Sequence, residues 1–594
     1  MKRAAVAAAF LVACSAASAG PAWHARVPLS SPPLAVEPDL ALSRGGEAVV
    51  VWDREDGPVC ASAPDNPACV HVLEARSRPV GAWDAPAEIM RPGVGPGPRV
   101  AVNSKGDAVV VWRHDIGAPR VLQAAWRPGT SRQWQAPIDL SGAGPMGGQD
   151  VGLDDAGNAV AAWTIDLGAG LVAQAEVRPF ASGSWGAPST LSRTGETAVG
   201  APDLAVNGAG DAVAVWTRGG GVVQASARSA STGVWQPAVD LAPGTQPQVV
   251  LDPAGNAVAV WAVPGGGVQG SFRPAGGGWS GPADVSRGAG TAVRIGVDDS
   301  GNAVAVWLSP TGPHVRSSRR SAATGAWSPP VDVSVAGVAA SEPDVAVDPR
   351  GNAAAVWNRA GAPTLRAALR PVATGSWLSG VGLSAAGVTT GDARVAIDAS
   401  GRALAIWTRR GPGESVVESS ELAGAGPVFT GVTIPTKRAA GKPVQFSLKS
   451  SAWAAPVVGR PLWRFGDTKT ASGQTVTHVY TVRGTYTVSV AHSDAAAGTS
   501  TASGTIKLVA VLNTVPPSVT RAGNTLSCSP GAWSGVTPIA YAFRWRRNGA
   551  LVPGATSSTY AIGDVDVGKG LVCSVTASNA VGATTGLSAP LTVR

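Results

Sequence analysis

The chain repeats one short phrase eight times: a turn containing glycine, then a run of small aliphatic residues that ends in tryptophan. The tryptophans that end the phrases follow one another at intervals of 45 to 60 residues: Trp52, Trp112, Trp163, Trp216, Trp261, Trp307, Trp357 and Trp407. Self-similarity at such a period indicates a repeat architecture, in which each copy buries its apolar surface against its neighbours. The repeat therefore constrains the fold strongly and the ligand very little.

Each repeat divides into four short predicted strands. In the fourth copy they cover residues 202–206, 211–216, 221–228 and 234–241. The first connection carries Asn or Asp before a glycine, which is the chemistry of a tight hairpin turn rather than of a calcium loop. The second strand, DAVAVW, is apolar on both faces, so both faces must be covered. Four-stranded blades packed around an axis meet that need, which predicts an all-β chain built on a β-propeller.

A second tryptophan series marks the fourth strand of each blade: Trp23, Trp83, Trp134, Trp185, Trp235, Trp279, Trp327 and Trp377. The last repeat has no such phrase, and the N-terminus carries an orphan copy around Trp23. We therefore expect the N-terminal strand to complete the last blade and close an eight-bladed ring, with seven blades as the alternative. All sixteen tryptophans are predicted to be core, because exposing so many large rings would invite aggregation.

An arginine recurs on the third strand of the repeats. Its copies are Arg78, Arg127, Arg178, Arg228, Arg273, Arg320 and Arg370. We expect these side chains to form a solvated face that protects strand edges. The alternative is a rim of guanidinium groups that holds a polyanion.

The N-terminus reads as a secretion signal over residues 1–19. Lys2 and Arg3 precede an apolar stretch, and small residues stand before Gly20 as at a cleavage site. Leu11 to Cys14 also resembles a bacterial lipobox, which would make Cys14 the lipidated N-terminus. No later stretch supplies the ~20 apolar residues of a membrane span. We expect an extracellular or cell-surface protein with a possible lipid anchor.

Cysteine use and charge agree with export. Besides Cys14, the four cysteines fall into two local pairs, Cys60 with Cys69 and Cys528 with Cys573, and we expect both pairs to form disulfides. A net charge of +8 over 594 residues is small, and no basic run suggests a nucleic-acid partner.

The loops that follow the second strands are the predicted ligand-binding face, because long loops on a rigid scaffold carry function. The first three of these loops are charged, and Trp126 is an aromatic residue that breaks the pattern of the third strands. The candidates in this region are Asp53, Asp56, Arg113, His114, Asp115, Asp166 and Trp126.

No catalytic motif is found. The chain has no HExxH, GxSxG or nucleotide-binding loop. The aspartate turns are faintly similar to those of sialidases, but all four tyrosines lie downstream of the repeats, and sialidases need a tyrosine nucleophile. Two carboxylates brought together from separate loops could still cleave a sugar chain, so a hydrolase or lyase is the alternative to a non-enzyme. We expect no cofactor and no metal.

Residues 427–510 resemble the PKD domain. The segment contains WRFGDT from Trp463, then HVY from His478, then GTYTVSV from Gly484. The usual signature is WDFGDG, H-x-Y and G-x-Y-x-V, from which Arg464 and Thr468 depart. The resemblance implies a β-sandwich that serves as an extracellular spacer or contacts proteins or sugars, without catalysis. Trp453 lies outside the signature, and we expect it to be exposed and available to a ligand.

Residues 511–594 resemble the bacterial immunoglobulin-like domains. Cys528, Trp545 and Cys573 stand in the order of the strand B cysteine, strand C tryptophan and strand F cysteine of that family. The resemblance implies a second β-sandwich. Leu571 stands where a tyrosine corner would be expected, so that feature is missing.

These observations predict a propeller over residues 20–426 followed by two β-sandwich modules. We expect a monomeric secreted or surface binding protein of adhesion type, whose partner is a polysaccharide or a cell-surface protein. The modules would act as a stalk or as auxiliary binders. A purely structural envelope protein is a further alternative.

Overall fold

A computed structural model describes residues 23–32, 34–56, 70–79, 81–91, 97–114, 120–310, 312–359, 364–422, 426–453, 455–495 and 498–594. These residues belong to two compact units that divide at residue 424. The predicted signal peptide (residues 1–19), Cys14, Cys60, Cys69 and Asp115 lie outside the described residues, so the predictions made on them stay predictions.

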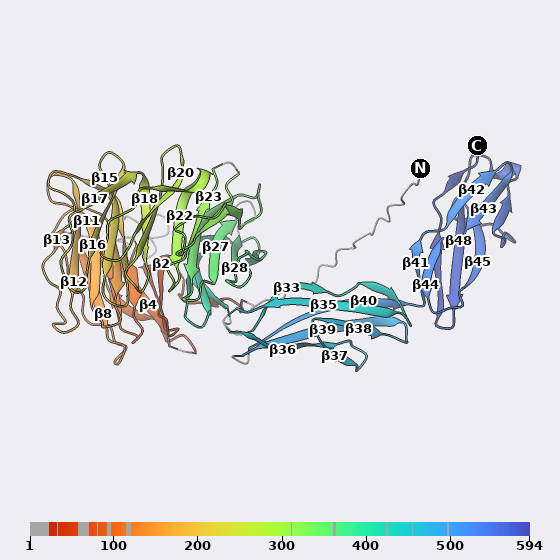
Figure 1. Ribbon diagram of the computed structural model, residues 1–594, viewed down its shortest axis with the longest axis horizontal. Helices are drawn as coiled ribbons and strands as arrows, with labels where there is room; N and C mark the ends of the chain where they lie inside the picture. Colours follow the sequence, from red (N-terminus) through yellow and green to blue (C-terminus); the bar gives the residue numbers. More distant parts are fainter. Residues whose placement is uncertain are drawn as a thin grey trace. The chain divides into compact units, whose positions relative to one another are not determined.

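The first unit is built from four-stranded antiparallel sheets (Figure 1), eight of them among its described residues and named here blades 1 to 8. Blades 1 to 4 comprise β2 (Leu34–Leu42), β3 (Ala48–Asp56), β4 (Val70–Arg78) and β5 (Ala87–Met90); β6 (Arg99–Val102), β7 (Ala108–His114), β8 (Val121–Arg127) and β9 (Ile138–Asp139); β10 (Met146–Leu153), β11 (Ala159–Asp166), β12 (Leu171–Arg178) and β13 (Ser189–Thr190); and β14 (Ala198–Val206), β15 (Ala212–Arg218), β16 (Val222–Arg228) and β17 (Val239–Pro243).

Blades 5 to 7 comprise β18 (Thr245–Leu251), β19 (Ala257–Ala262), β20 (Gly267–Arg273) and β21 (Ala283–Ala289); β22 (Thr291–Val297), β23 (Ala303–Leu308), β24 (Val315–Arg320) and β25 (Val331–Asp332); and β26 (Ala340–Val347), β27 (Ala353–Arg359), β28 (Thr364–Arg370) and β29 (Val381–Gly382). Blade 8 comprises β30 (Thr389–Ile397), β31 (Ala403–Gly411), β32 (Glu414–Leu422) and β1 (Val27–Pro28).

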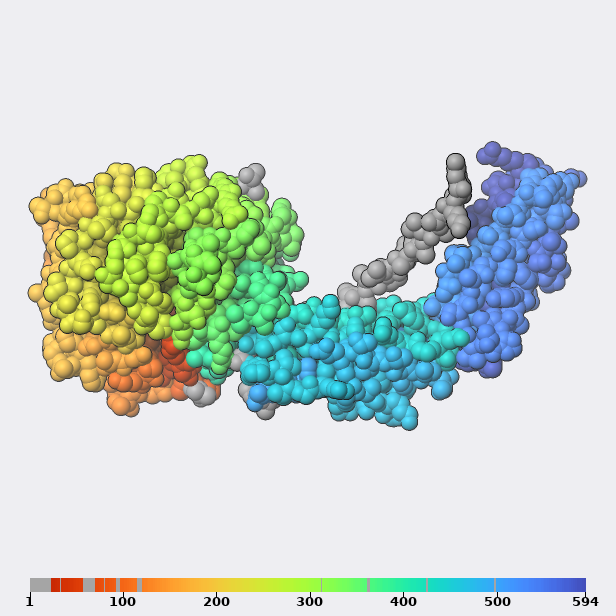
Figure 2. Space-filling model, viewed as in Figure 1, coloured from red at the N-terminus to blue at the C-terminus, as the bar shows by residue number. Residues whose placement is uncertain are grey.

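The innermost strands follow one another around a common axis. Each packs against the innermost strand of the next blade, and β30 of blade 8 packs against β2 of blade 1. In Figure 2 the atoms of successive blades, coloured from orange to green, form one continuous packed body. In blade 8, β1 pairs with β32, with Val27 opposite Ser419. The Leu29 N–H also donates to the Val417 carbonyl at 2.7 Å.

The hairpin turns have the predicted chemistry. In blade 5 the Asp252 carboxylate accepts from the backbone N–H of Asn256 at 2.9 Å and from its side-chain amide at 2.7 Å. Gly255 has a φ of +85°, the left-handed conformation that glycine adopts without strain. The aspartates of these turns are therefore occupied in holding their own hairpins.

The two tryptophan series differ in depth. The rings on the second strands are buried, as predicted. In the fourth-strand series only Trp327 is buried and the other seven rings are half-buried, so the prediction that all sixteen are core is wrong for these. The reason is position, because each of these tryptophans stands four residues before its outermost strand begins and, except for Trp23, in the connection from the third strand, where fewer strands surround the ring.

The recurring arginines are not a solvated face. Six of the seven are buried and Arg228 is half-buried, which corrects that prediction. Their guanidinium groups lie over aromatic rings or bond to nearby turns. The Arg178 guanidinium carbon lies 4.0 Å from the centre of the Trp126 ring, and Arg127 donates to the Gly106 carbonyl at 3.1 Å. Arginine can be buried in this way because its planar group stacks on aromatic rings, although Arg127 Nε and Arg178 Nη1 are buried without a hydrogen-bond partner among the described residues.

Residues 428–509 of the second unit form a β-sandwich. Its two sheets have the orders β33-β35-β38 and β34-β40-β39-β36-β37. The strands are β33 (Val428–Thr433), β34 (Lys437–Ala439), β35 (Pro443–Ser451), β36 (Val457–Arg464), β37 (Thr470–Ser472), β38 (Thr475–Val479), β39 (Gly484–Asp494) and β40 (Thr499–Val509). Trp463, Phe465 and Tyr480 are buried in its core, and the Tyr480 hydroxyl donates to the Phe465 carbonyl at 2.9 Å.

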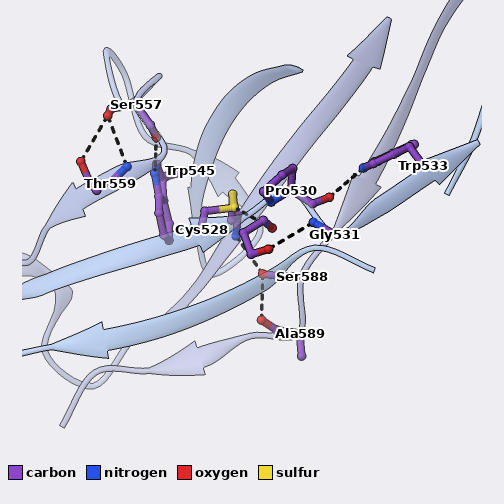
Figure 3. The surroundings of a disulfide bond; sticks show 11 residues. Cys528, Pro530, Gly531, Trp533, Trp545, Ser557, Thr559, Ser588 and Ala589 are labelled. Carbon is purple, nitrogen blue, oxygen red and sulfur yellow. Dashed lines mark hydrogen bonds between the residues drawn. A yellow bond between two sulfur atoms is a disulfide. The ribbon is translucent and has the colours of Figure 1, made fainter. Parts of the chain in front are cut away.

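Residues 511–592 carry the last strands: β41 (Val511–Val515), β42 (Ser518–Ala522), β43 (Thr525–Ser529), β44 (Ala532–Gly535), β45 (Ala540–Arg547), β46 (Ala550–Leu551), β47 (Thr559–Ala561), β48 (Gly570–Asn579), β49 (Gly582–Leu587) and β50 (Leu591–Thr592), with a short 3-10 helix η1 (Asp564–Asp566). The predicted disulfide between Cys528 and Cys573 is confirmed, and it joins β43 to β48. Buried Trp545 lies beside Cys528 (Figure 3) and opposite Cys573 in the sheet register. Nowhere in the described chain is a helix long and apolar enough to span a membrane.

Candidate functional site

A polar ring lines the axis of the first unit. In every blade, the innermost strand pairs with the second strand. One residue of the innermost strand lies opposite the residue that directly precedes the second-strand tryptophan, and that residue of the innermost strand is always polar. These channel-ring residues are Asp39, Arg99, Asp150, Asp203, Gln248, Arg294, Asp344 and Arg394. Most of these innermost strands have a β-bulge, seen as a shift in register, just before the channel-ring residue. Six of the eight residues line a cavity of about 690 Å³.

The aspartates of the channel ring link neighbouring blades by hydrogen bonds. Asp39 accepts from the Val100 N–H at 2.9 Å, Asp150 from Leu204 at 2.8 Å, Asp203 from Val249 at 2.7 Å and Asp344 from Val395 at 2.9 Å. In each case the donor is the residue that follows the ring position of the next blade. This repeated bond gives the channel ring a structural role.

Two of these aspartates are neighbours of like charge. Burial and the charge of Asp203 raise the pKa of Asp150 to about 7. Burial also raises the pKa of Asp203. The stretch of the ring between blades 3 and 4 therefore gains stability when a proton is bound there.

The predicted loop residues lie in different surroundings. Asp53 is buried on β3, where its Oδ2 lies 2.7 Å from His71 Nδ1. Burial raises the pKa of the Asp53 carboxyl, against the opposing effect of His71. Asp56, at the end of the same strand, points to the other face and pairs with Arg54 and, at 2.8 Å, with Arg91.

Arg113 and His114 are consecutive on β7 and point to opposite faces. Arg113 donates to the Met146 carbonyl of blade 3 at 3.4 Å. His114 shares its face with Trp112, which packs against blade 1. Asp166 accepts from the N–H groups of Gly168 at 2.8 Å and Gly170 at 2.9 Å, so it holds its own turn. The described members of the predicted set therefore do not gather at one point, although Asp53 and His114 lie on faces that meet.

Trp126 is covered. Its side chain is 6% exposed, and the Arg178 guanidinium lies over the ring. A sugar could not stack on that face of the ring without displacing the arginine.

A cleft that the sequence reasoning missed lies between blades 6 and 7. It encloses about 490 Å³, and its walls carry two indoles and two guanidinium groups: Trp357, Trp377, Arg359 and Arg366. Trp357 and Arg359 are alternate residues of β27, and Arg366 lies directly opposite Trp357 on β28. All three side chains therefore share the face that looks toward blade 6.

A single glycine opens this cleft. Gly380 stands three residues after Trp377, and a Cβ there would lie 2.9 Å from the Trp357 ring. The equivalent residues of the other repeats all carry side chains: Arg26, Pro86, Pro137, Pro188, Ala238, Pro282 and Pro330. Trp357 is accordingly the one second-strand tryptophan with measurable exposure, at 4%. This break in the repeat was visible in the sequence and could have pointed to the cleft.

The guanidinium groups of the cleft lack carboxylate partners. Neither Arg359 nor Arg366 forms an ion pair within the part of the chain that the structure describes, and Arg359 Nε is buried there without a hydrogen-bond partner. Burial and the nearby charge of Arg359 lower the pKa of Arg366. Asp332, the acid of the cleft, already binds Arg316 at 3.1 Å and His314 at 3.2 Å. The cleft therefore offers two positive charges that a ligand could neutralise.

Residues 424–509 match the PKD domain family. This confirms the resemblance drawn from WRFGDT and the motifs that follow it. Within the PKD domain, Trp453 is 2% exposed, so the expectation of an exposed aromatic ring there is wrong.

Several solved structures are distantly similar to the chain. The BP39L lectin from Burkholderia pseudomallei is 14% identical, with a TM-score of 0.43 over 59% of this chain and 99% of that one. An Aleuria aurantia lectin bound to Fucalpha1-6GlcNAc is 10% identical, with a TM-score of 0.32 over 59% and 94%. A fungal alcohol oxidase of the AA5 family, in complex with copper, is 10% identical, with a TM-score of 0.38 over 83% and 100%. Likenesses this distant identify no function. A search of curated proteins gives no match.

Proposed function

We propose that the chain is an exported carbohydrate-binding protein that holds an acidic sugar in the cleft between blades 6 and 7. The observation that carries this proposal is that Trp357, 4% exposed, lines the cleft beside Arg359 and Arg366, two guanidinium groups without carboxylate partners among the described residues.

The chemistry of the cleft suits such a ligand. The apolar C–H face of a sugar ring can pack on an indole, and Trp377 supplies a half-buried one. A carboxylate or sulfate can accept paired hydrogen bonds from a guanidinium group, which binds it with defined geometry. A neutral sugar would leave the charge of Arg359 and Arg366 uncompensated, so the cleft favours an anionic one.

The same cleft offers poor catalysis. A glycosidase needs two carboxyl groups that flank the bond to be cleaved. Asp332 is the one carboxylate among the described lining residues, and Arg316 and His314 already engage it. We therefore propose binding without turnover.

The scaffold of this function is proposed to be an eight-bladed ring closed by the N-terminal strand. The eight four-stranded sheets and the pairing of β1 with β32 support that count. The disulfide suits an exported protein. We propose that the PKD domain and an immunoglobulin-like module after it serve as a stalk or auxiliary binders, that residues 1–19 direct export, and that the chain is monomeric.

Isothermal titration of the full chain with oligogalacturonate and with an uncharged oligosaccharide of equal length tests the proposal. We expect binding of the acidic sugar alone, and we expect Arg366→Gln to weaken it at least tenfold. Glutamine already stands at this register position in blades 2 to 5, for example Gln224, so the substitution is compatible with the blade. Binding of neither sugar, or equal binding of the acidic sugar by wild type and Arg366→Gln, would overturn the proposal.

A further inference from the structure

Three metal-ligating side chains meet on one face of blade 1, far along the ring from the cleft. Asp53 and Glu55 are alternate residues of β3, and His71 on β4 lies directly opposite Glu55. Alternation in a strand therefore places all three on the same face. One ligand atom from each lies within 4.8 Å of the other two.

The two carboxylates are buried. Asp53 is 3% exposed and Glu55 is 8% exposed. Asp53 Oδ1 is buried without a hydrogen-bond partner among the described residues, although Oδ2 contacts His71. His71 can supply at most one positive charge against the two carboxylates. Arg54, the residue between them, points to the opposite face, where it bonds Glu74 at 2.8 Å. A buried carboxylate oxygen such as Asp53 Oδ1 is costly unless a ligand satisfies it.

A second imidazole faces this cluster from blade 2. Val49 and Val51 of blade 1 share a core with Val110 and Trp112 of blade 2, so those faces are in contact. His114 lies on that face of β7, and its Nδ1 is buried without a hydrogen-bond partner in the described structure. It stands two residues after Trp112, whereas Asp53 and Glu55 stand one and three after Trp52. Counted from the tryptophan of each second strand, His114 therefore lies at the same position along its strand as the cluster does on β3.

We infer that Asp53, Glu55 and His71 form a Zn²⁺ site between blades 1 and 2, with His114 as the candidate fourth ligand. Imidazole nitrogen and carboxylate oxygen are ligands that zinc accepts, whereas calcium and magnesium prefer oxygen alone. Ligand atoms of a tetrahedral zinc site lie roughly 3.4 Å apart, since each is about 2.1 Å from the metal. The three ligand atoms, which lie within 4.8 Å of one another, would close to that distance when the metal binds.

Zinc and cobalt titrations of the full chain, after removal of metal with a chelator, test the site. We expect one Zn²⁺ per chain and a rise of about 3 °C in the Tm of the propeller unit at saturating metal. We also expect Co²⁺ to give visible d–d absorption without a thiolate charge-transfer band, because no sulfur is among the proposed ligands. Glu55→Gln and His71→Ala should each weaken Zn²⁺ binding by at least tenfold.

His314→Ala is the matched control. His314 also pairs with an aspartate on a blade, but with the single carboxylate Asp332. Its loss should leave the zinc titration unchanged. If His71→Ala fails to fold, Glu55→Gln decides, because it keeps the shape of the side chain. The inference is overturned if wild type binds no Zn²⁺ more tightly than Glu55→Gln does, if His314→Ala loses the site, or if the cobalt spectrum shows thiolate ligation.

Discussion

The two tryptophan series share one period but lie at different depths in the blade. On the second strands the ring is enclosed on both faces, as for Trp216, whose indole N–H donates to Gln224 at 3.0 Å. In the second series the ring stands four residues before the fourth strand begins and is half-buried, as for Trp235. The difference shows that a tryptophan repeated at a regular interval marks the scaffold. Whether a ligand can also reach that tryptophan depends on where it lies in the blade.

The cleft between blades 6 and 7 brings the two series together. Its walls include Trp357 from the inner series and Trp377 from the outer one. Gly380 removes the side chain that would otherwise crowd Trp357. One scaffold ring thereby becomes reachable, and the comparison between the series can be tested by substitution.

The largest expected effect is on folding. Trp216→Ala should lower the free energy of unfolding of the propeller unit by about 3–5 kcal/mol, because it leaves a cavity and takes the donor from Gln224 Oε1. Trp235→Ala should cost only about 1–2 kcal/mol, since part of that ring is already in water. Urea denaturation followed by circular dichroism measures both, and equal losses would break the comparison.

A second prediction extends the comparison inward to the channel ring. The pKa of Asp150 is raised from 3.8 to about 7, so the folded chain binds this proton more tightly than the unfolded chain does. That stabilisation is complete below about pH 4 and is lost as the pH rises toward 7. We expect the free energy of unfolding to fall by about 1–2 kcal/mol across this window, because water in the channel screens part of the effect.

Asp150→Asn should flatten this pH dependence and stabilise the chain at pH 8, while its side-chain oxygen still accepts from Leu204. Asp39→Asn is the control, because Asp39 lies 4.0 Å from Arg394 and its loss should destabilise the chain at that pH. Denaturation midpoints at pH 5 and pH 8 distinguish the two variants. A midpoint for Asp150→Asn that stays below wild type at pH 8 would contradict the assignment.

The third prediction separates binding from stability within the outer series. Trp377→Ala should weaken acidic-sugar binding about tenfold, or ~1.4 kcal/mol, because it removes the half-buried wall of the cleft. Trp235→Ala, its counterpart in another blade, should bind normally while losing similar stability. Titration calorimetry on both variants checks this, and equal affinities would show that the cleft does not hold the sugar.

The smallest effect is expected from Gly380→Ala. The added methyl would press on the Trp357 ring from 2.9 Å and narrow the cleft, so affinity should fall by a few-fold (~0.5–1 kcal/mol). Gly281→Ala is the control, because Gly281 stands two residues after Trp279 of blade 5 and its added methyl would meet no atom within 4 Å. A loss of affinity in the control as large as in Gly380→Ala would remove the role given to this glycine.

Much of the fold could be predicted because its signals are local and repeated. Apolar residues on both faces of the second strands, Asx turns such as that of Asp252, and the cysteines 528 and 573 each act within one element or domain. The pairing of Val27 with blade 8 could be predicted by counting copies of one phrase.

The site could be predicted less well, because it depends on which faces meet across blades. Neither the covering of Trp126 by Arg178 nor the opposed directions of Arg113 and His114 follow from one repeat read alone. The recurring arginines are predicted to be solvated from their charge alone, because the sequence does not show which aromatic rings lie over their guanidinium groups. The cleft could be predicted only by comparing the same position in all eight repeats, where Gly380 stands in one and a larger residue stands in each of the other seven.

The bond between the first and last described strands of the propeller unit bears on how quickly the ring can assemble. Ser419 donates to the Val27 carbonyl across 392 residues of chain, whereas contacts within a blade join residues fewer than about 60 apart. Loop-closure entropy grows only with the logarithm of length, about 0.6 kcal/mol for each doubling, so roughly three doublings cost about 2 kcal/mol. That cost is modest at equilibrium, but contacts of such separation form late. If the ring has the eight blades proposed above, a partly synthesised chain would hold seven folded blades and an unpaired edge until its final hairpin emerges.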